Sequence, residues 1–133
     1  MPRNIQDYLL TKTKALPAQN TNNSSDSIDL EQVTLDSVNE VLDALLTVPA
    51  TPSLANSQTI TYTFQDSADN SSFAAIPELA TAVSTGGGGV GAAAVSRRVK
   101  LPPTTRRYLR VNAAVSATGG DNTAISYTIK VLA

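Results

Sequence analysis

Cysteine, histidine and tryptophan are all absent from this chain of 133 residues. Without cysteine there is no disulfide framework, no zinc–thiolate site and no cysteine nucleophile. Without histidine the chain lacks the usual general base of enzymes and the commonest metal ligand. Since the acidic residues are also scattered over loops, we expect no catalytic residues, no metal site and no cofactor. We therefore predict that the protein is not an enzyme.

Charged and aromatic side chains are also scarce, at 16% and 5% of the sequence. A chain of this length is expected to form one domain and to bury about 65–70% of its unfolded surface. Its core would be rich in small side chains, which favours a fold that gains stability from neighbouring subunits. No apolar run approaches the ~18 residues of a membrane span, and the N-terminus lacks the pattern of a secretory signal. We expect a soluble protein that is made in the cytoplasm and has no membrane partner.

Charge is unevenly distributed, although the net charge is only −1. Ten acidic and three basic residues precede Arg97, whereas seven basic residues and one acid lie from Arg97 onward. One interpretation is a phosphate-binding patch. The other is a solvated strand face, or a patch that meets the acidic half of the same or a neighbouring subunit. We favour the second and expect no nucleic-acid partner, because Tyr108 is the one aromatic residue among the basic residues between Arg97 and Arg110.

Apolar and polar residues alternate in several short runs, which is the pattern of half-buried strands. The run 106–115 places Val111 on one face and Arg110 on the other, and the run 123–131 alternates in the same way. The loop 116–122 between them is rich in Gly, Asp and Asn. Two alternating runs joined by such a loop predict an antiparallel hairpin.

Two further runs are predicted strands. The run 59–65 places its three large side chains on one face and threonines on the other, as a strand prefers. In the run 95–101, Arg98 and Lys100 are expected to face outward. Arg97 shares the buried face in this pattern, so a bulge or an interface must accommodate it.

Residues 28–49 fit two interpretations. Four apolar residues between positions 38 and 46 have helical spacing, yet 41–48 fits a buried strand that ends at Pro49 equally well. We predict a strand for 41–48, because the chain downstream is β. The segment 73–83 fits either a short helix or an irregular edge segment.

Two loops partly resemble functional motifs. Asp66 and Asp69 suggest a calcium loop, but the glycine, the closing glutamate and the regular ligand spacing of an EF-hand are missing. The segment 86–91 matches G-x-G-x-x-G without a convincing preceding strand, a later acid, or the Lys-Ser/Thr of a phosphate-binding loop. We predict that both are ordinary loops.

Short strands, long polar loops and the lack of a convincing long helix predict an all-β fold, an antiparallel β-sandwich or jelly roll. Residues 1–30 are predicted to form an extended N-terminal arm, because they are mostly polar and cannot bury enough apolar surface alone. Residues 31–133 would form the sandwich. The apolar residues Tyr8, Leu9 and Leu10 belong either to a flexible tail or to an arm that inserts them into a groove on a partner.

Three parts of the chain resemble the jelly-roll capsid cement (decoration) proteins of tailed bacteriophages. These parts are Tyr8-Leu9-Leu10 with the polar stretch to Ser27-Ile28-Asp29-Leu30, the strand and loop 60–69, and the segment 101–115 with Arg107-Tyr108-Leu109-Arg110-Val111. The resemblance implies a β-sandwich that binds the outer capsid surface across boundaries between major capsid protein subunits. It also implies a homo-oligomer, a dimer or a trimer, on a local symmetry axis.

We therefore expect a structural virion protein on the capsid exterior that stabilises contacts between major capsid protein subunits. Modest contacts repeated by symmetry suit this role, since multivalency converts them into tight binding. The residues that we expect at the capsid or oligomer interface are Tyr8, Leu9, Leu10, Arg97, Arg106 and Arg110.

Two other functions stay open at this point. One is a carbohydrate-binding β-sandwich module, as in a tail fibre, although tryptophan is absent and Tyr62 and Tyr127 are expected to face inward. The other is a minor tail or head-completion protein, which would differ from a decoration protein in its copy number per particle.

Overall fold

Antiparallel strands make up most of the computed structural model, which describes residues 11–30, 43–102 and 104–132. The strands are β1 (Thr11–Ala15), β2 (Asn22–Ser24), β3 (Ile28–Asp29), β4 (Asp43–Val48), β5 (Thr59–Ser67), β6 (Ala74–Ala75), β7 (Ala82–Thr85), β8 (Val95–Lys100), β9 (Tyr108–Val115) and β10 (Ser126–Leu132). No α-helix occurs in these ranges, and so none that could span a membrane.

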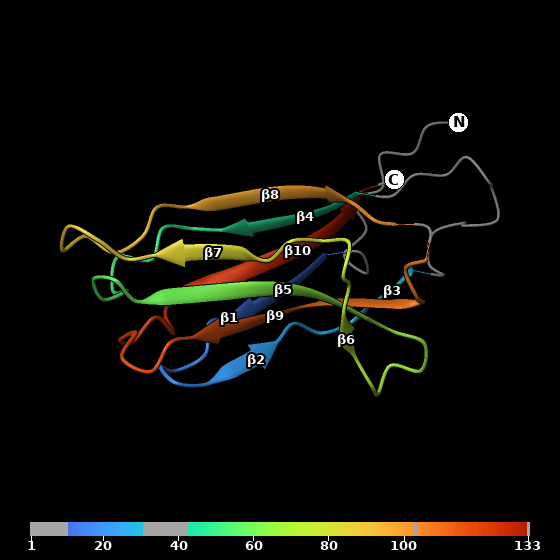
Figure 1. The fold of residues 1–133 in the computed structure, drawn as a ribbon, viewed down its shortest axis with the longest axis horizontal. Coiled ribbons are helices and arrows are strands. Elements are labelled where there is room, and N and C mark those ends of the chain that lie inside the picture. Colours follow the sequence, from blue (N-terminus) through green and yellow to red (C-terminus); the bar gives the residue numbers. More distant parts are fainter. Residues whose placement is uncertain (1–10, 31–42, 103, 133) are drawn as a thin grey trace.

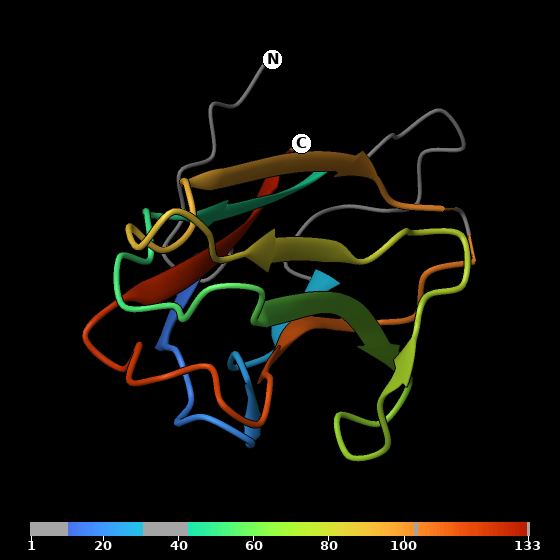
Figure 2. The same ribbon diagram turned by 60° about the vertical axis from the view of Figure 1, so that its left-hand side comes forward.

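The strands form two sheets that face each other (Figure 1). The four-stranded sheet has the order β1-β10-β4-β8. The six-stranded sheet has the order β2-β9-β5-β6, with β3 also beside β9 and β7 beside β5. In Figure 2, β8 and β4 form one side of the molecule, and β5, β9 and β6 form the other. The predicted all-β sandwich is confirmed.

The core lies between the two sheets and follows the period of two in the sequence. Ile60, Tyr62 and Phe64 of β5 are all at most 1% exposed, as the alternation predicts. Tyr127 of β10 is also fully buried, and its ring lies 6.0 Å from that of Tyr62 at an angle of 60°, an edge-to-face contact between the sheets. Burying each large side chain stabilises the folded state by roughly 1.5–3 kcal/mol, before the loss of conformational entropy is subtracted.

The predicted hairpin between 106–115 and 123–131 is wrong. β9 lies in the six-stranded sheet, where it pairs with β2, β3 and β5, whereas β10 lies in the four-stranded sheet between β1 and β4. The connection from 116 to 125 therefore crosses from one sheet to the other (Figure 1). Alternation decides which side chains are buried, but it does not identify the strand that supplies the backbone partners. The connection is also longer than the roughly 2–5 residues usual in hairpins.

The predicted arm is wrong for residues 11–30, which belong to the sandwich. β1 pairs with β10, while β2 and β3 pair with β9. Leu16, Ile28 and Leu30 are each at most 2% exposed. A polar segment can join a sheet because the pairing uses backbone groups, and here three apolar side chains are sufficient to anchor it. Residues 1–10, with Tyr8, Leu9 and Leu10, lie outside the described residues.

The remaining segment predictions have mixed outcomes. The strand over 41–48 is confirmed for β4, and residues 31–42 lie outside the described residues. The segment 73–83 is an irregular edge with two short strands, β6 and β7, and no helix. β8 is a strand with the predicted parity, and Arg97 lies opposite Leu46 in an unbroken register. Arg97 is half-buried at the edge of the sheet, so the edge position accommodates it without a bulge.

Candidate interaction surface

The outward side of the six-stranded sheet carries a row of half-buried polar side chains. Thr61, Thr63 and Gln65 of β5 alternate with the core residues, and Arg110 and Asn112 of β9 do the same. The register places Thr63 opposite Asn112 and Gln65 opposite Arg110. We call these five residues the polar face.

Arg110 is held in place by two neighbours. Its Nε donates a hydrogen bond to Gln65 Oε1 at 2.8 Å, and its guanidinium carbon lies 3.9 Å from the centroid of the Phe73 ring. The ring attracts the cation and covers it from one side. Partial burial lowers the pKa of the Arg110 guanidinium from its ordinary value. Because both contacts fix the side chain, little rotamer entropy is left to lose when a partner binds it.

Asn112 is fixed in the same way by β2. Its Nδ2 donates to Ser24 Oγ at 3.0 Å and to Asn22 Oδ1 at 3.2 Å. Hydrogen bonds between side chains on neighbouring strands stabilise the sheet and also orient the surface groups. The polar face is therefore arranged before any partner arrives.

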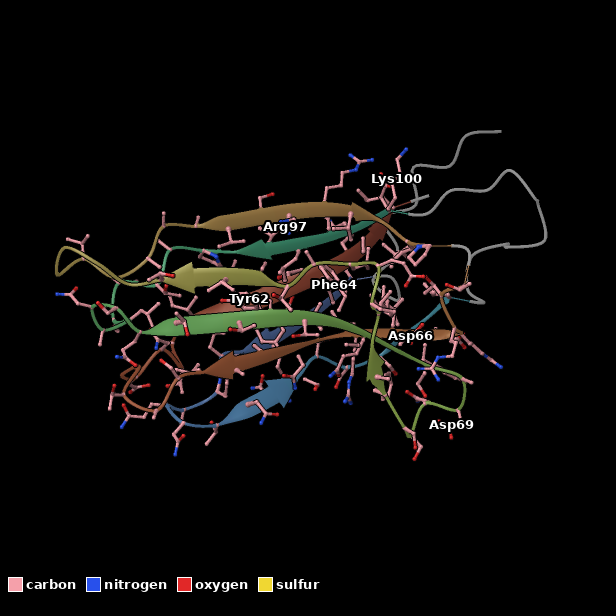
Figure 3. The ribbon with its side chains drawn as sticks, viewed as in Figure 1. Tyr62, Phe64, Asp66, Asp69, Arg97 and Lys100 are labelled. Atoms are coloured by element: carbon pink, nitrogen blue, oxygen red, sulfur yellow. The ribbon has the colours of Figure 1, made fainter. Side chains whose placement is uncertain are left out.

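Arg106 and Asp66 form an ion pair at one end of the core. Asp66 follows Phe64 on the inward side of β5, and its side chain is 10% exposed. The backbone N–H of Arg106 donates to Asp66 Oδ2 at 2.9 Å, and the guanidinium donates to Oδ1 and to the backbone carbonyl. These bonds compensate a carboxylate that is largely removed from water. Figure 3 shows Asp66 near the end of β5, next to β6.

The loop after β5 folds around Asp69 (Figure 3). Its Oδ1 accepts hydrogen bonds from the Ser67 hydroxyl and from the backbone N–H groups of Ser71 and Ser72. Those bonds, with that from Ser72 the largest, lower the pKa of the Asp69 carboxyl to about 2. Asp66 and Asp69 thus have separate roles, and the described residues contain no group of three or more acidic side chains that could hold a metal ion.

At the opposite end of the sandwich, three loops interlock through their backbones. We call the loops 51–58, 86–91 and 116–122 the glycine end. Ala55 N donates to Gly119 O at 3.2 Å, and Ser57 N donates to Gly86 O at 2.9 Å. Gly91 has a φ of +75°, and a Cβ there would collide with the carbonyl of Thr51. Glycine is needed at this position for both reasons.

The three arginines of the predicted interface, which are its described members, do not form one patch. Arg110 lies on β9 beside β5, and Arg106 lies just before β9 and binds Asp66 of β5. Arg97, in contrast, lies on β8 of the other sheet. Three basic residues pair with acids of the N-terminal half, and these pairs are Arg98–Asp43 at 2.7 Å, Arg106–Asp66 at 2.7 Å and Arg107–Asp29 at 3.0 Å. For these residues, the interpretation that the two oppositely charged halves meet within one subunit is confirmed.

Sequence reasoning missed the partners that position the arginines. The sequence interpretation of Asp66 as a loop residue is wrong, because Asp66 lies in β5 and continues the inward parity of Tyr62 and Phe64, a signal that is present in the sequence. No local signal places Phe73 over Arg110, because the contact depends on the path of the chain between β5 and β6. The inward orientation of Tyr62 and Tyr127 was predicted correctly.

The geometry describes an antiparallel β-sandwich with a fixed polar face on one sheet. The chain belongs to the Bbp16 family, whose family model matches residues 12–131. The match runs from β1 to β10, so it covers both sheets. No curated protein matches the chain in a sequence search.

Proposed function

We propose that this protein decorates the exterior of a phage capsid and stabilises the contacts between major capsid protein subunits. The observation that supports this most strongly is the polar face. It carries side chains that are held by their neighbours, as in the bonds of Arg110 to Gln65 and of Asn112 to Ser24. A fixed polar face loses little entropy on docking, so even modest contacts contribute to binding.

The strand order supports the jelly-roll form of this proposal. Along the chain, the strands alternate between the sheets: β1 and β4 belong to the four-stranded sheet, with β2 and β3 of the other sheet between them. β5, β6 and β7 then lie in the six-stranded sheet, and β8, β9 and β10 alternate between the two sheets again. This strand order fits the two packed sheets expected of a jelly roll. The resemblance to capsid cement proteins implied this fold.

A decoration protein would act as a homo-oligomer, a dimer or a trimer, at many equivalent positions of the shell. Each copy then needs only weak contacts, because linked copies bind with a high effective concentration. Within the polar face, Arg110 would contact the shell. Arg106 contributes indirectly, by fixing the end of β5 through Asp66.

The proposal is tested by adding the full-length protein to capsids that have been stripped of it. We expect hundreds of copies to bind per particle and the particles to gain resistance to heat and osmotic shock. Thr63→Lys places a long charged side chain in the polar face and should weaken capsid binding. Thr47→Lys makes the same change at an exposed position on the outer side of β4, and it should bind as the parent does.

Three results would contradict the proposal. Particles with and without the protein could be equally resistant to heat and shock. A dozen copies or fewer per particle would instead indicate a tail or neck protein. Specific hits on a glycan array, without capsid binding, would indicate a carbohydrate-binding module.

A further inference from the structure

β8 is the longest of the strands that lie at an edge of either sheet in the described part of the chain. It has six residues and pairs with β4 in a regular register from Val95 to Lys100. Its other side has no backbone partner among the described residues. Every second N–H and C=O group of an edge strand points away from the sheet, which makes such an edge a template for another strand.

The other sheet edges offer a shorter pairing surface for an added strand. In the six-stranded sheet, β6 has two residues and β7 has four. In the four-stranded sheet, the opposite edge is β1, where the Asn23 side chain donates to the Ala15 carbonyl at 2.8 Å and occupies part of the edge. β8 is therefore the edge with the greatest capacity to accept an added strand.

The charge of β8 indicates what kind of strand would fit. Three of its six residues, Arg97, Arg98 and Lys100, are basic, and none is acidic. Arg98 is bound to Asp43 of β4, and the side chains of Arg98 and Lys100 are both exposed on the outer side of the sheet. Figure 3 shows Lys100 at the end of β8. A strand that lies beside β8 would place its own side chains directly opposite these cations, where carboxylates are favoured.

The inward side of β8 is incompletely covered. Val95, Arg97 and Val99 face the core side, yet all three are half-buried, whereas the corresponding Ala44, Leu46 and Val48 of β4 are at most 1% exposed. An added strand would cover these side chains further. Covering them removes apolar surface from water, which adds to the backbone hydrogen bonds.

We propose that the free edge of β8 binds an extended acidic segment of another protein as an additional antiparallel or parallel strand. Carboxylates at alternate positions of that segment lie opposite Arg98 and Lys100. The inference relies on the proposed function for the source of the segment, which is a capsid subunit. A second copy of β8 is a poor occupant, because pairing two such edges would bring three basic residues against three others.

The test measures the binding of a synthetic peptide of about eight residues that alternates Glu and Val to the full-length protein. Hydrogen exchange of the β8 amides reports where it binds. We expect the outward amides of β8 to be exposed in the free protein and protected by the peptide. The same peptide with N-methyl groups along one edge keeps its charge but cannot pair, and it should leave these amides exposed.

Charge variants separate this pairing from diffuse attraction. Lys100→Glu on β8 should weaken peptide binding by roughly tenfold. Lys130→Glu makes the same change on β10, which is not an edge strand, and should have little effect.

Each of the other outcomes contradicts the inference. The edge amides could already be protected in the free protein, which would mean that another part of the chain or a second copy covers β8. The methylated peptide or the Lys130→Glu variant could bind like their counterparts, which would indicate nonspecific charge attraction. If Lys100→Glu still binds capsids like the parent protein, the inference fails and the proposed decoration function remains.

Discussion

The two ends of the sandwich are closed by different chemistry. At the glycine end, the loops 51–58, 86–91 and 116–122 include one charged residue, Asp121, and they are joined by backbone hydrogen bonds. At the opposite end, which we call the charged end, Asp66 pairs with Arg106 and Asp29 with Arg107. The first end depends on close approach of backbones, and the second depends on ionised side chains.

This difference predicts that the two ends respond in opposite ways to salt, to pH and to substitutions. The glycine end should tolerate changes in salt and pH but not an added Cβ at a contact position. The charged end should tolerate small changes of backbone but not the loss of a charge that is buried with its partner. Mutations at the two ends can therefore be compared within one protein.

The largest expected effect is that of Gly91→Ala. Its φ of +75° is strained for alanine, and its Cβ would collide with the Thr51 carbonyl. We expect the free energy of unfolding to fall by about 3 kcal/mol or more in urea titrations. Gly87→Ala is the control, because no atom lies within 4 Å of its Cβ position, and it should change stability by less than about 0.5 kcal/mol. Similar losses in both variants would show that the loops do not interlock.

The second largest effect is expected at the charged end. Arg106→Ala leaves the Asp66 carboxylate, with its side chain 10% exposed, without its cation, and should lower the free energy of unfolding by about 2 kcal/mol. This value lies below that of a fully buried pair because Arg106 is 42% exposed. Arg107→Ala removes a more exposed pair and should cost less than about 1 kcal/mol. If the two variants are equally stable, Asp66 is better solvated than its burial indicates.

Alkaline pH tests the core between the two ends. Burial raises the pKa of Tyr62 from 10.0 to about 12, and burial also raises the pKa of Tyr127. The folded state therefore holds the Tyr62 proton more tightly than the unfolded state does. This contribution is complete below pH 10 and is lost as the pH rises through about 12. Between pH 10 and pH 12, the free energy of unfolding from urea titrations should fall by about 2 kcal/mol. Tyr62→Phe should make this dependence of stability on pH less steep.

The hydroxyl groups of Tyr62 and Tyr127 should contribute differently to the stability of the fold. Tyr127 Oη donates to Asn23 Oδ1 at 2.8 Å, so Tyr127→Phe should lower the free energy of unfolding by about 1 kcal/mol. Tyr62 Oη has no partner in hydrogen-bond geometry, although the nearby Ser84 hydroxyl partly offsets the effect of burial on its pKa. Tyr62→Phe should thus be neutral or slightly stabilising at neutral pH. A clear loss of stability in Tyr62→Phe would reveal a bridging water or a closer approach of Ser84.

The smallest effect is expected in the exposed loop around Asp69. Its carboxyl has a pKa lowered to about 2, so its contribution to loop order is present above the ordinary value near 3.8 and is lost as the pH falls through about 2. NMR titration of the Ser71 and Ser72 amides should show this transition with little change in global stability. Asp69→Asn should shift the amide signals at neutral pH, and a midpoint near 3.8 in the parent protein would contradict the hydrogen-bond network.

The sequence predicted the side of each strand that faces the core more reliably than the neighbours of each strand. The alternation in β5 and β9 identified their buried residues correctly, because burial depends on a period that one segment carries by itself. Strand pairing depends on contacts between distant segments, so the hairpin prediction was wrong. The same limit applies to Asp66 and Phe73, whose roles depend on Arg106 and Arg110 far along the chain.

Residues 11–30 show a second limit of prediction from sequence, which concerns amino-acid composition. Their polar character indicated an arm, but backbone pairing with β9 and β10 brings them into both sheets. Composition reports how much apolar surface a segment can bury, whereas a strand at an edge needs little of it. Tyr8, Leu9 and Leu10 remain a prediction for the capsid interface.

The position of β10 has a consequence for how the protein is made. This strand lies between β1 and β4, and the hydroxyls of Thr13 and Thr128 meet at 3.1 Å across 115 residues of sequence. The ribosome synthesises β10 after every other described strand. Until then, β1 and β4 of the nascent chain lack the strand that pairs with both of them. Contacts this distant in sequence make folding slow, and incomplete sheets expose strand edges. Nascent chains stalled before β10 should therefore bind chaperones, and the addition of β10 should be the step that completes the four-stranded sheet.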